Sequence, residues 1–376
     1  MKVLITGGAG FIGSKLSLEL KKKGYGVTVL DNLSHQIHGE YPEKTSLLYK
    51  SIIDEVIFIK GDVTKTEDWQ RAIINQDVIV HLASETGTGQ SMYQIERYTE
   101  VNILGTSKML DILVNEDHTI KKVIIASSRA IYGEGKYYHS ILGDMYPNSR
   151  DVKNMENGDF EMRYSDGEVL QVLPTDEDSK IHPISIYGIT KQNQEQMIMT
   201  VCGALGIAAV SLRFQNVYGK GQSLLNPYTG ILSIFSAQIL NGEEINVFED
   251  GKESRDFIYV DDAVEAVVKS IENEKANGEI FNVGTGIRTT IYEVAEWLRK
   301  LYDKNVEINI SGQFRLGDIR HNFADINKIK SRLGFQPEIT FKEGLLKFTD
   351  WVLRQDVQEI KFKQSIEEMK IKGFLK

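Results

Sequence analysis

The stretch Thr6-Gly7-Gly8-Ala9-Gly10-Phe11-Ile12-Gly13 decides the fold of this chain. It follows an apolar run at 3–5 and opens a segment in which Phe11, Ile12, Leu16 and Leu20 recur at helical spacing. Glycines at these places allow a tight turn, a close approach of the backbone to a pyrophosphate, and close helix packing. Amide groups at the start of the helix attract the anion. The stretch therefore predicts a dinucleotide-binding turn between a strand and a helix.

Runs of β-branched residues alternate with helical patterns through the first half of the chain. The runs lie at 3–6, 27–30, 56–60, 78–82, 123–127 and 209–214. Such alternation is typical of βαβ units, in which helices cover both faces of a parallel sheet. We therefore expect an α/β fold with a doubly wound parallel sheet.

The pattern loosens after Phe214. Helical patterns remain near 230–240, 291–301 and 341–353, the charged stretch after Trp351 is helical in pattern, and the run at 278–283 is expected to return to the main sheet. These features predict a cofactor domain at 1–215 plus about 245–283. A smaller, discontinuous substrate lobe would comprise 216–244 and 284–376.

Residues 135–181 form a long excursion within the cofactor domain. The segment is rich in Gly, Asn, Asp and aromatic residues and has little clear periodicity. Long stretches without secondary structure are uncommon in compact domains. Three interpretations stay open: a lid, a contact between subunits, or an inert insertion.

Composition restricts the partners. The 376 residues carry 44 Lys and Arg against 53 Asp and Glu, a net charge of −9, without a long basic run. This balance argues against nucleic acid as a partner. An anionic substrate must be held by individual arginines and backbone amides, because the overall field repels it.

Bulk features also bear on location and metals. The one cysteine, Cys202, excludes an internal disulfide and a thiolate cluster for zinc, so no metal is predicted. The sequence begins at once with an expected strand, and no apolar run approaches the roughly 18 residues that span a bilayer. We expect a cytoplasmic protein without a membrane partner.

Two carboxylates follow expected strands. Asp31 ends the second strand, about 20 residues after the glycines, where it can accept hydrogen bonds from both hydroxyls of an adenosine ribose. Its charge would repel a 2′-phosphate, which favours NAD over NADP. Asp62, after the third strand, is predicted to meet the adenine amino group.

Tyr187 and Lys191 form the candidate catalytic pair. Their separation places both on one face of a helix that opens near Tyr187. A tyrosine that acts as a base needs a pKa lowered from about 10 toward 7, worth roughly 4 kcal/mol. Lys191 and the positive nicotinamide ring are expected to supply this. Ser128, at the end of the fifth strand, is expected to hydrogen-bond the reacting oxygen.

A second pair has the same spacing. Tyr132 and Lys136 straddle Gly133 and Gly135 just after a strand, where a helical register is improbable. We therefore predict that this pair is not catalytic.

The chain resembles the extended short-chain dehydrogenases/reductases, the family of nucleotide-sugar epimerases and dehydratases. The likeness runs from Met1 to at least Trp351 and rests on the features above and on further stretches: His81-Leu82-Ala83, Asn102-Ile103-Leu104-Gly105-Thr106, Arg213-Phe214-Gln215-Asn216-Val217-Tyr218-Gly219, Arg255-Asp256-Phe257-Ile258-Tyr259-Val260-Asp261-Asp262, Asn282-Val283-Gly284-Thr285-Gly286 and Arg315-Leu316-Gly317-Asp318-Ile319-Arg320.

The resemblance implies roles for individual residues. The cofactor NAD would contact Gly7, Gly10, Phe11, Ile12, Gly13, Asp31, Asn32, Asp62, Val63, Leu82, Ala83, Asn102, Tyr187 and Lys191. The substrate would contact Thr86, Ser128, Arg129, Asn216, Phe248, Arg255 and Arg315. Among the latter, Asn216, Arg255 and Arg315 would hold the diphosphate, and Phe248 would pack on the nucleotide base. The family often dimerises through a helix pair, so the resemblance implies a homodimer, with the Tyr187 helix as the candidate contact.

The resemblance also selects among reactions. Related dehydratases carry an Asp-Glu pair right after the strand-end Ser or Thr, and decarboxylases keep the Glu. Here the two places hold Arg129 and Ala130. The remaining reaction is epimerisation at C4 of a nucleotide-bound hexose through a 4-keto sugar.

Three further stretches bear on the substrate: 85–93, 221–223 and Asn226-Pro227-Tyr228-Thr229-Gly230. They look most similar to dTDP-L-rhamnose 4-epimerases, which interconvert dTDP-L-rhamnose and dTDP-6-deoxy-L-talose, and UDP-glucose 4-epimerases are the broader neighbours. The alternatives are an NAD-dependent oxidoreductase with net turnover, a dehydratase or decarboxylase, and a dinucleotide sensor without activity.

Overall fold

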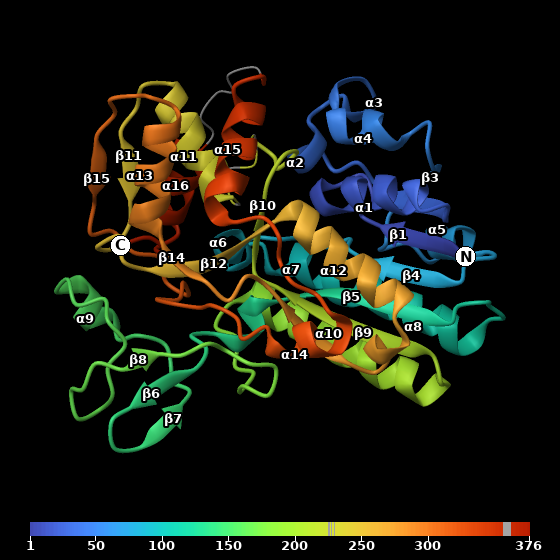
Figure 1. The fold of residues 1–376 in the computed structure, drawn as a ribbon, viewed down its shortest axis with the longest axis horizontal. Helices are drawn as coiled ribbons and strands as arrows, with labels where there is room; N and C mark the ends of the chain where they lie inside the picture. Colours follow the sequence, from blue (N-terminus) through green and yellow to red (C-terminus); the bar gives the residue numbers. More distant parts are fainter. Residues whose placement is uncertain (225, 227, 229, 356–361) are drawn as a thin grey trace.

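The computed structural model describes residues 1–376 except 225, 227, 229 and 356–361 (Figure 1). Its main element is a parallel seven-stranded sheet in the order β13-β9-β5-β4-β1-β2-β3. The strands are β1 Lys2–Thr6, β2 Gly26–Asp31, β3 Ile57–Lys60, β4 Val78–His81, β5 Lys122–Ser128, β9 Ala208–Phe214 and β13 Ile280–Val283. The predicted doubly wound parallel sheet is confirmed, including the return of a strand near 280.

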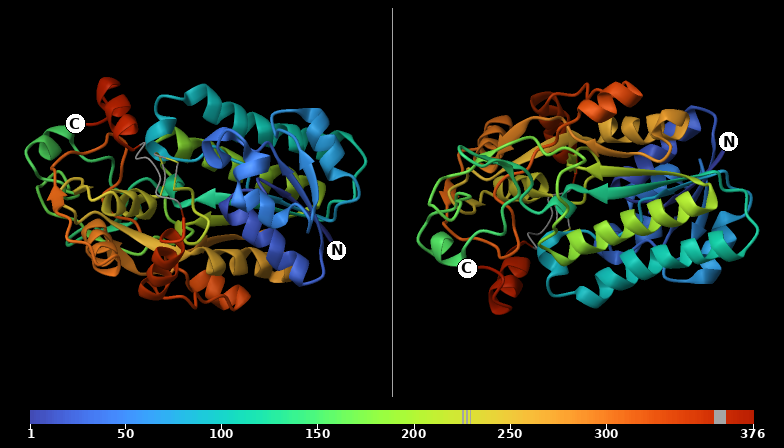
Figure 2. Two further views of the ribbon diagram at one scale, coloured as in Figure 1. Left: turned by 90° about the horizontal axis from the view of Figure 1, so that it is seen from above. Right: turned by 90° about the horizontal axis from the view of Figure 1, so that it is seen from below.

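Helices cover both faces of this sheet. One face is covered by α1 Phe11–Lys22 and α12 Val260–Glu272, and the other by α5 Thr66–Ile73, α8 Gly105–Asn115 and α10 Ile186–Leu205 (Figure 2). Val3 and Ile5 pack into the core on the α1 face, and Leu4 packs into the core that also holds Trp69. Successive side chains of a strand point to opposite faces, so an apolar run is buried on both sides.

The strand order reverses at β1, which lies between β2 and β4. Chain connections leave the sheet in opposite directions at such a point, and this opens a crevice at the carboxyl ends of the strands. The glycine turn after β1, Asp31 at the end of β2 and Ser128 at the end of β5 all lie at this edge.

Short elements connect the strands and the lobes. The helices are α2 His35–His38, α3 Pro42–Thr45, α4 Leu47–Ile52, α6 Thr88–Ser91, α7 Ile95–Tyr98, α14 Asn327–Leu333 and α16 Phe362–Ile371, with the π-helix η1 Thr99–Leu104 and the 3₁₀ helices η2 Arg129–Tyr132 and η3 Glu274–Ala276. In the part of the chain that is described, no helix combines the length and apolar character needed to cross a bilayer.

Among the described residues, the smaller lobe contains two small sheets and, besides α16, three further helices. The sheets join β10 Asn216–Tyr218 to β12 Ser254–Tyr259 and β14 Arg288–Thr290, and β11 Ile245–Val247 to β15 Ile308–Ile310. The helices are α11 Ile231–Leu240, α13 Ile291–Leu301 and α15 Phe341–Val352. Within this lobe β11 pairs with β15, and β12 pairs with β10 and β14. The chain therefore returns to the main sheet at α12 rather than near the expected residue 245.

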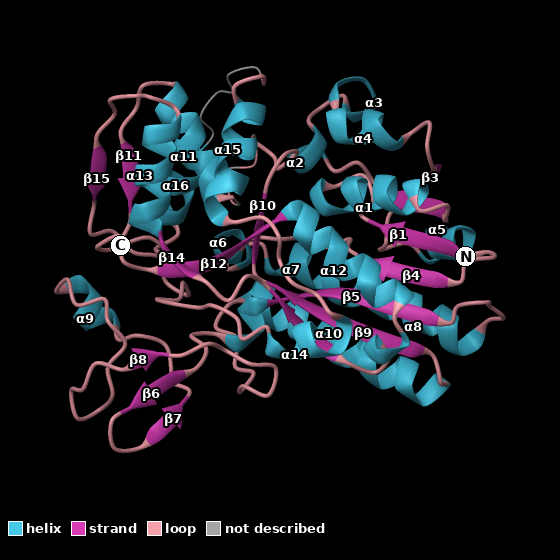
Figure 3. Cartoon of the chain, in the orientation of Figure 1, coloured by secondary structure: helices cyan, strands magenta, loops and turns pink. Residues whose placement is uncertain are grey.

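The excursion at 135–181 is folded, which corrects the expectation of a stretch without secondary structure (Figure 3). It forms the sheet β7-β6-β8 from β6 Tyr137–His139, β7 Gly143–Met145 and β8 Gln171–Val172, together with α9 Val152–Glu156. Tyr137, Met162 and Leu170 form its small core. Strands of two or three residues are too short to give a readable period in the sequence.

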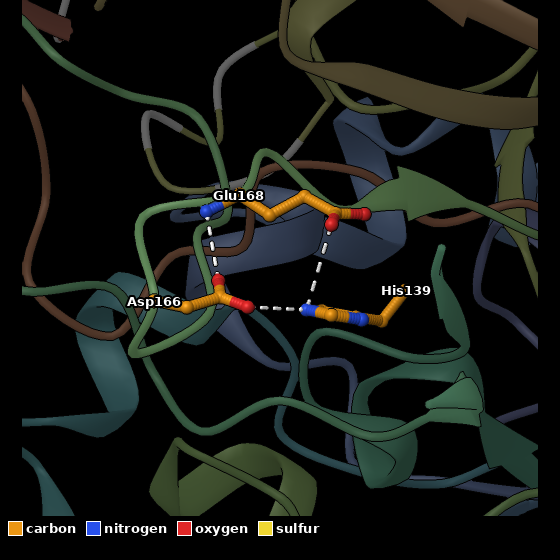
Figure 4. Close-up of side chains that lie close together, drawn as sticks. All are labelled: His139, Asp166 and Glu168. Atoms are coloured by element: carbon orange, nitrogen blue, oxygen red, sulfur yellow. Dashed lines mark hydrogen bonds and ion pairs between the residues drawn. The ribbon is translucent and has the colours of Figure 1, made fainter. Parts of the chain in front are cut away.

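A cluster of three polar side chains cross-links this excursion (Figure 4). His139 Nε2 lies 2.9 Å from Asp166 Oδ2 and 3.6 Å from Glu168 Oε2. His139 Nδ1 accepts hydrogen bonds from the backbone N–H groups of Ile141 and Leu142. The imidazole thus ties the β6–β7 turn to the segment before β8.

Candidate active site

One cavity of about 480 Å³ extends from the glycine turn to the candidate catalytic pair. Most of the residues predicted to contact cofactor or substrate line it: Gly7, Gly10, Phe11, Ile12, Gly13, Asp31, Asn32, Val63, Leu82, Ala83, Thr86, Ser128, Arg129, Tyr187, Lys191 and Asn216. Asp62, Asn102, Phe248, Arg255 and Arg315 lie outside its lining. The fold therefore places the glycine turn and the candidate catalytic residues around the same cavity.

The glycine turn is shaped by the lack of side chains. Gly7 has a φ of +67°, and a Cβ on it would lie 2.8 Å from Ala83 N. A Cβ on Gly13 would lie 2.3 Å from Gly7 O. No side chain caps α1 at Gly10, so the first amide groups of the helix remain available to an anion. This cradle fits the pyrophosphate of a dinucleotide such as NAD.

Asp31 holds the turn as well as facing the cavity. Its Oδ2 accepts a hydrogen bond from Ala9 N at 2.9 Å, and its Oδ1 accepts one from Leu33 N at 2.8 Å. Burial raises the pKa of Asp31 above its ordinary value, although these bonds act in the opposite direction. Each carboxylate oxygen has further lone pairs, so the group can still accept bonds from ribose hydroxyls.

Three other predicted cofactor residues have local partners. Asn32 Nδ2 donates to Asp62 Oδ2 at 2.9 Å, and Asp62 Oδ1 accepts from Thr64. Asn102 is fully buried, where its amide bonds the backbone of Glu85. Contact of Asp62 or Asn102 with a cofactor stays a prediction.

The candidate base, Tyr187, lies at the start of α10, which Ser185 caps through a hydrogen bond from Gly188 N. Ser128 lines the same cavity as Tyr187. Burial raises the pKa of Tyr187 above its ordinary value, while the nearby Ser128 hydroxyl and the charge of Arg129 lower it. In the chain alone, burial outweighs these two effects.

Lys191 lies one turn further along α10 and is 2 % exposed. Its Nζ donates to Gln194 Oε1 at 2.7 Å. Burial lowers the pKa of Lys191 to about 7, against the opposing charge of Glu195. Arg129 is the cation that lowers the pKa of Tyr187 in the chain alone, and the effect of the Lys191 ammonium on the phenol stays a prediction.

The second pair is structural, as predicted. The Tyr132 hydroxyl donates to Asn282 Oδ1 at 2.8 Å and accepts from Arg213 Nη1 at 2.7 Å. Lys136 pairs with Asp144 and Asp176 in the excursion. The two side chains thus serve different contacts.

Arg129 and Asn216 lie together in the cavity wall. Arg129 Nε donates to Asn216 Oδ1 at 2.9 Å. Burial, followed by the nearby charge of Arg255, lowers the pKa of Arg129 to about 10. A cation crowded in this way favours a bound anion.

The remaining predicted substrate residues gather in the smaller lobe. The guanidinium of Arg315 stacks on the ring of Phe248 at 4.6 Å, and its buried Nε has no hydrogen-bond partner among the described residues. Arg255 Nη2 donates to Asp318 Oδ1 at 3.0 Å. Pro227 and Thr229, from the stretch at 226–230, lie outside the described residues.

The sequence analysis missed two residues, one in the cavity lining and one that contacts Lys191. His38 lines the cavity with Nε2 4.0 Å from Asp31 Oδ1. Gln194 accepts the bond from Lys191 and donates to Thr106 Oγ1 at 2.8 Å. The spacing of Gln194 from Lys191 on one helical face is a signal that points to their contact, whereas nothing in the sequence marks His38.

Known proteins match this chain along most of its length. A family model described as "NAD dependent epimerase/dehydratase family" matches residues 3–150 and 164–284. The dTDP-L-rhamnose 4-epimerase of Burkholderia thailandensis is 33% identical over 357 residues, which cover 94% of this chain and 95% of that protein.

Solved structures agree with this match. The UDP-glucose 4-epimerase of Thermotoga maritima with UDP-glucose superposes with a TM-score of 0.73 at 30% identity, covering 94% of this chain and 99% of that one. The UDP-glucuronic acid 4-epimerase of Bacillus cereus, in complex with UDP-glucuronic acid and NAD, gives 0.76 at 26% identity over the same shares. With its glycine cradle, strand order and these matches, the chain belongs to the NAD dependent epimerase/dehydratase family.

Proposed function

We propose that this protein is an NAD-dependent 4-epimerase of a nucleotide-activated hexose. The observation that carries the proposal is the single cavity that holds the glycine cradle at one end and Ser128, Tyr187 and Lys191 at the other. A dinucleotide lying along this space reaches the tyrosine with its nicotinamide end. The relatives named as 4-epimerases support the same reaction.

The chain's own residues suit oxidation and return at one sugar carbon. Tyr187 removes the proton of the C4 hydroxyl, and Ser128, which lines the same cavity, holds the same oxygen. Lys191 and Arg129 contribute positive charge that favours the phenolate. When bound, NAD supplies the hydride acceptor and donor and a further positive charge. The keto sugar turns over between the two hydride transfers, so C4 is inverted without net redox change.

Carboxylates in the cavity support epimerisation over dehydration. Among the described residues, those that line it are Asp31, which is held by the glycine turn, and Glu85, which pairs with Arg97 at 2.8 Å. Ala130 has no titratable group, and Arg129 remains a cation. No acid–base pair therefore stands beside Tyr187 to expel water from the sugar.

The substrate we favour is dTDP-L-rhamnose or dTDP-6-deoxy-L-talose, with a UDP-hexose as the second candidate. The 33% identical relative supports the first choice. Asn216, Arg129, Arg255 and Arg315 would hold the diphosphate, and Phe248 the base. An oxidoreductase with net turnover is the alternative reaction.

A homodimer through α8 and α10 is part of this proposal. The two helices lie side by side on one face of the sheet (Figure 2). They expose Ile189 and Leu205 on α10 and Val114 on α8, and Leu104 just before α8 is exposed as well. Exposed apolar side chains on two adjacent helices are surface that a subunit contact would bury.

One experiment tests the function. The purified protein is incubated with NAD and a panel of dTDP- and UDP-hexoses, and the C4 epimers are resolved by NMR. We expect one epimer pair to equilibrate without accumulation of NADH, and Tyr187→Phe to abolish turnover while leaving NAD bound. Stoichiometric NADH or a dehydrated 4-keto-6-deoxy product would overturn the proposal.

A further inference from the structure

The excursion at 135–181 is attached to the smaller lobe through a buried arginine. The side chain of Arg150 is 3 % exposed, and it forms a two-pronged pair with Glu249, with Nη1–Oε2 and Nη2–Oε1 distances of 2.8 Å. The fork of a guanidinium matches a carboxylate in this way and fixes its orientation. Glu249 itself is buried.

The same guanidinium reaches the segment that carries Asp318. Arg150 Nη2 donates to Asp318 O at 3.2 Å. On its other side, Asp318 accepts a hydrogen bond from Arg255, whose Nη2 also donates to Ile319 O at 2.8 Å and whose Nη1 donates to Arg320 O at 3.0 Å. The position of Arg255 therefore depends on the turn at 318–320.

A second tie joins the excursion to this turn. Arg320 is fully buried and pairs with Glu161 of the excursion at 2.5 Å and with Asp250 at 2.6 Å. Its backbone N–H donates to Glu134 Oε2 at 2.8 Å. Turn 318–320 is thus held from both the smaller lobe and the excursion.

Several arginines surround the carboxylate of Asp318. Burial raises the pKa of Asp318, but the charges of Arg255, Arg315, Arg129 and Arg150 outweigh this effect, so the pKa lies below its ordinary value. Four guanidinium groups act on one carboxylate, and the buried Arg315 Nε lacks a partner among the described residues. A buried guanidinium N–H that is left without a partner in this way suits a bound anion.

We propose that the excursion is a brace for the diphosphate site, in which Arg150 is a positioning residue that fixes turn 318–320 and with it Arg255 and Arg315. This inference rests on the proposed function, because it takes a nucleoside diphosphate as the anion. It assigns to the excursion neither the role of a lid nor that of an inert insertion.

The brace acts on the predicted diphosphate residues Arg255 and Arg315, which lie outside the cavity lining, and not on the cofactor end of the cavity. Among the described residues, the hydrogen-bond and ion-pair partners of Arg150 are Glu134, Phe160, Glu249 and Asp318, and they include neither the glycine turn nor Tyr187 nor Lys191. Loss of its fork should therefore weaken the diphosphate grip while leaving the affinity for NAD and the chemical step in place. The expected signature is a rise in KM with kcat nearly unchanged.

The test measures binding to the full-length protein loaded with NAD. Titration calorimetry with dTDP and with UDP is compared for the wild type, Arg150→Met and Arg150→Lys. We expect Arg150→Met to raise the Kd of the preferred diphosphate at least tenfold, and Arg150→Lys to lie between, since it keeps the charge but not the fork. Arg163→Met is the matched control, because Arg163 is an exposed arginine that pairs within the excursion with Asp159.

Each outcome decides one claim. Wild-type affinity in Arg150→Met overturns the brace while the proposed function stands. A wild type that binds neither dTDP nor UDP overturns the proposed function and the brace with it. Equal losses of NAD and diphosphate binding in Arg150→Met would mean a general structural role, and they also overturn the brace. If Arg150→Met does not fold, Glu161→Gln removes the Arg320 tie and is expected to raise the same Kd.

Discussion

Lys191 and Gln194 are joined by a hydrogen bond of 2.7 Å from the lysine Nζ to the amide oxygen, one turn apart on α10. Gln194 in turn donates to Thr106 Oγ1 at 2.8 Å and lies 3.3 Å from His81 Nε2. His81 Nδ1 lies 2.7 Å from Thr6 Oγ1, at the start of the glycine turn. A buried polar chain therefore connects the candidate catalytic lysine to the cofactor cradle.

Removing the amide should reduce activity in a pH-dependent way. Gln194→Leu deletes a bond to the charged form of Lys191, so the pKa of this group, already about 7, should fall further. Less ammonium is then present at neutral pH, and we expect kcat at pH 7.5 to drop by about tenfold and to recover partly at lower pH. Gln196→Leu, at an exposed site of the same helix, is the control. An unchanged pH profile of kcat would contradict the assignment.

Arg129 is expected to lower the pKa of Tyr187. Its positive charge lowers the pKa of Tyr187 against the effect of burial. Arg129→Met removes that charge, so the pKa of the phenol should rise, and the acid limb of kcat against pH should move upward by about one pH unit. Arg129→Lys keeps a cation and should keep the limb near its wild-type position. A limb that stays in place in both variants would assign the tuning to another group.

Two glycines with opposite surroundings form a matched test of the cradle. Gly13→Ala would place a methyl group 2.3 Å from Gly7 O and 2.6 Å from Gly8 Cα, both backbone atoms that cannot give way easily. We expect loss of NAD binding in calorimetry and a lower melting temperature. Gly203→Ala, in α10, meets nothing within 4 Å and should stabilise the fold by about 0.5 kcal/mol. NAD affinity near the wild-type value in Gly13→Ala would refute the geometry of the turn.

Glu253 should make stability fall as pH rises. Burial and the charge of Glu249 raise its pKa to about 8 in the folded protein. The folded state therefore binds a proton that the unfolded state has released, and stability is lost as pH rises from about 4.5 to 8. Glu253→Gln mimics the protonated form.

Chemical denaturation of Glu253→Gln should give a gain of about 2 kcal/mol at pH 8.5 and almost none at pH 5. The pKa shift, which already includes the charge of Arg320 at 3.9 Å, sets an upper limit of about 5 kcal/mol on this gain. Glu55→Gln, at an exposed position, is the control. Equal gains at both pH values would contradict the assigned ionisation.

The sequence could predict the main sheet because its strands are buried on both faces. The runs at 27–30 and 209–214 are buried throughout, and the glycine turn fixes which strand is first. The sequence could also predict that Tyr187 and Lys191 share one face of α10, because this depends only on the geometry of one helix.

Long-range contacts between short elements were beyond the reach of the sequence. The pairing of β11 with β15 joins residues about 60 positions apart through three-residue strands, so the boundary near 245 could not be read. The Arg150–Glu249 pair is equally remote, because single charged residues have no period that reveals their partner. The contact between Lys191 and Gln194 could be inferred from helical spacing, but an uncharged amide does not stand out in the sequence as a partner of the lysine.

The cross-link at His139 has a consequence for how the brace is maintained. Because two backbone N–H groups point at Nδ1, that nitrogen carries the lone pair, and the hydrogen of the neutral ring sits on Nε2, between the two carboxylates. The hydrogen on Nε2 therefore occupies the position at which a divalent metal ion would need the lone pair of that nitrogen. Among the described residues, the hydrogen bonds of one imidazole, rather than a metal ion or a disulfide, therefore cross-link these two segments of the excursion.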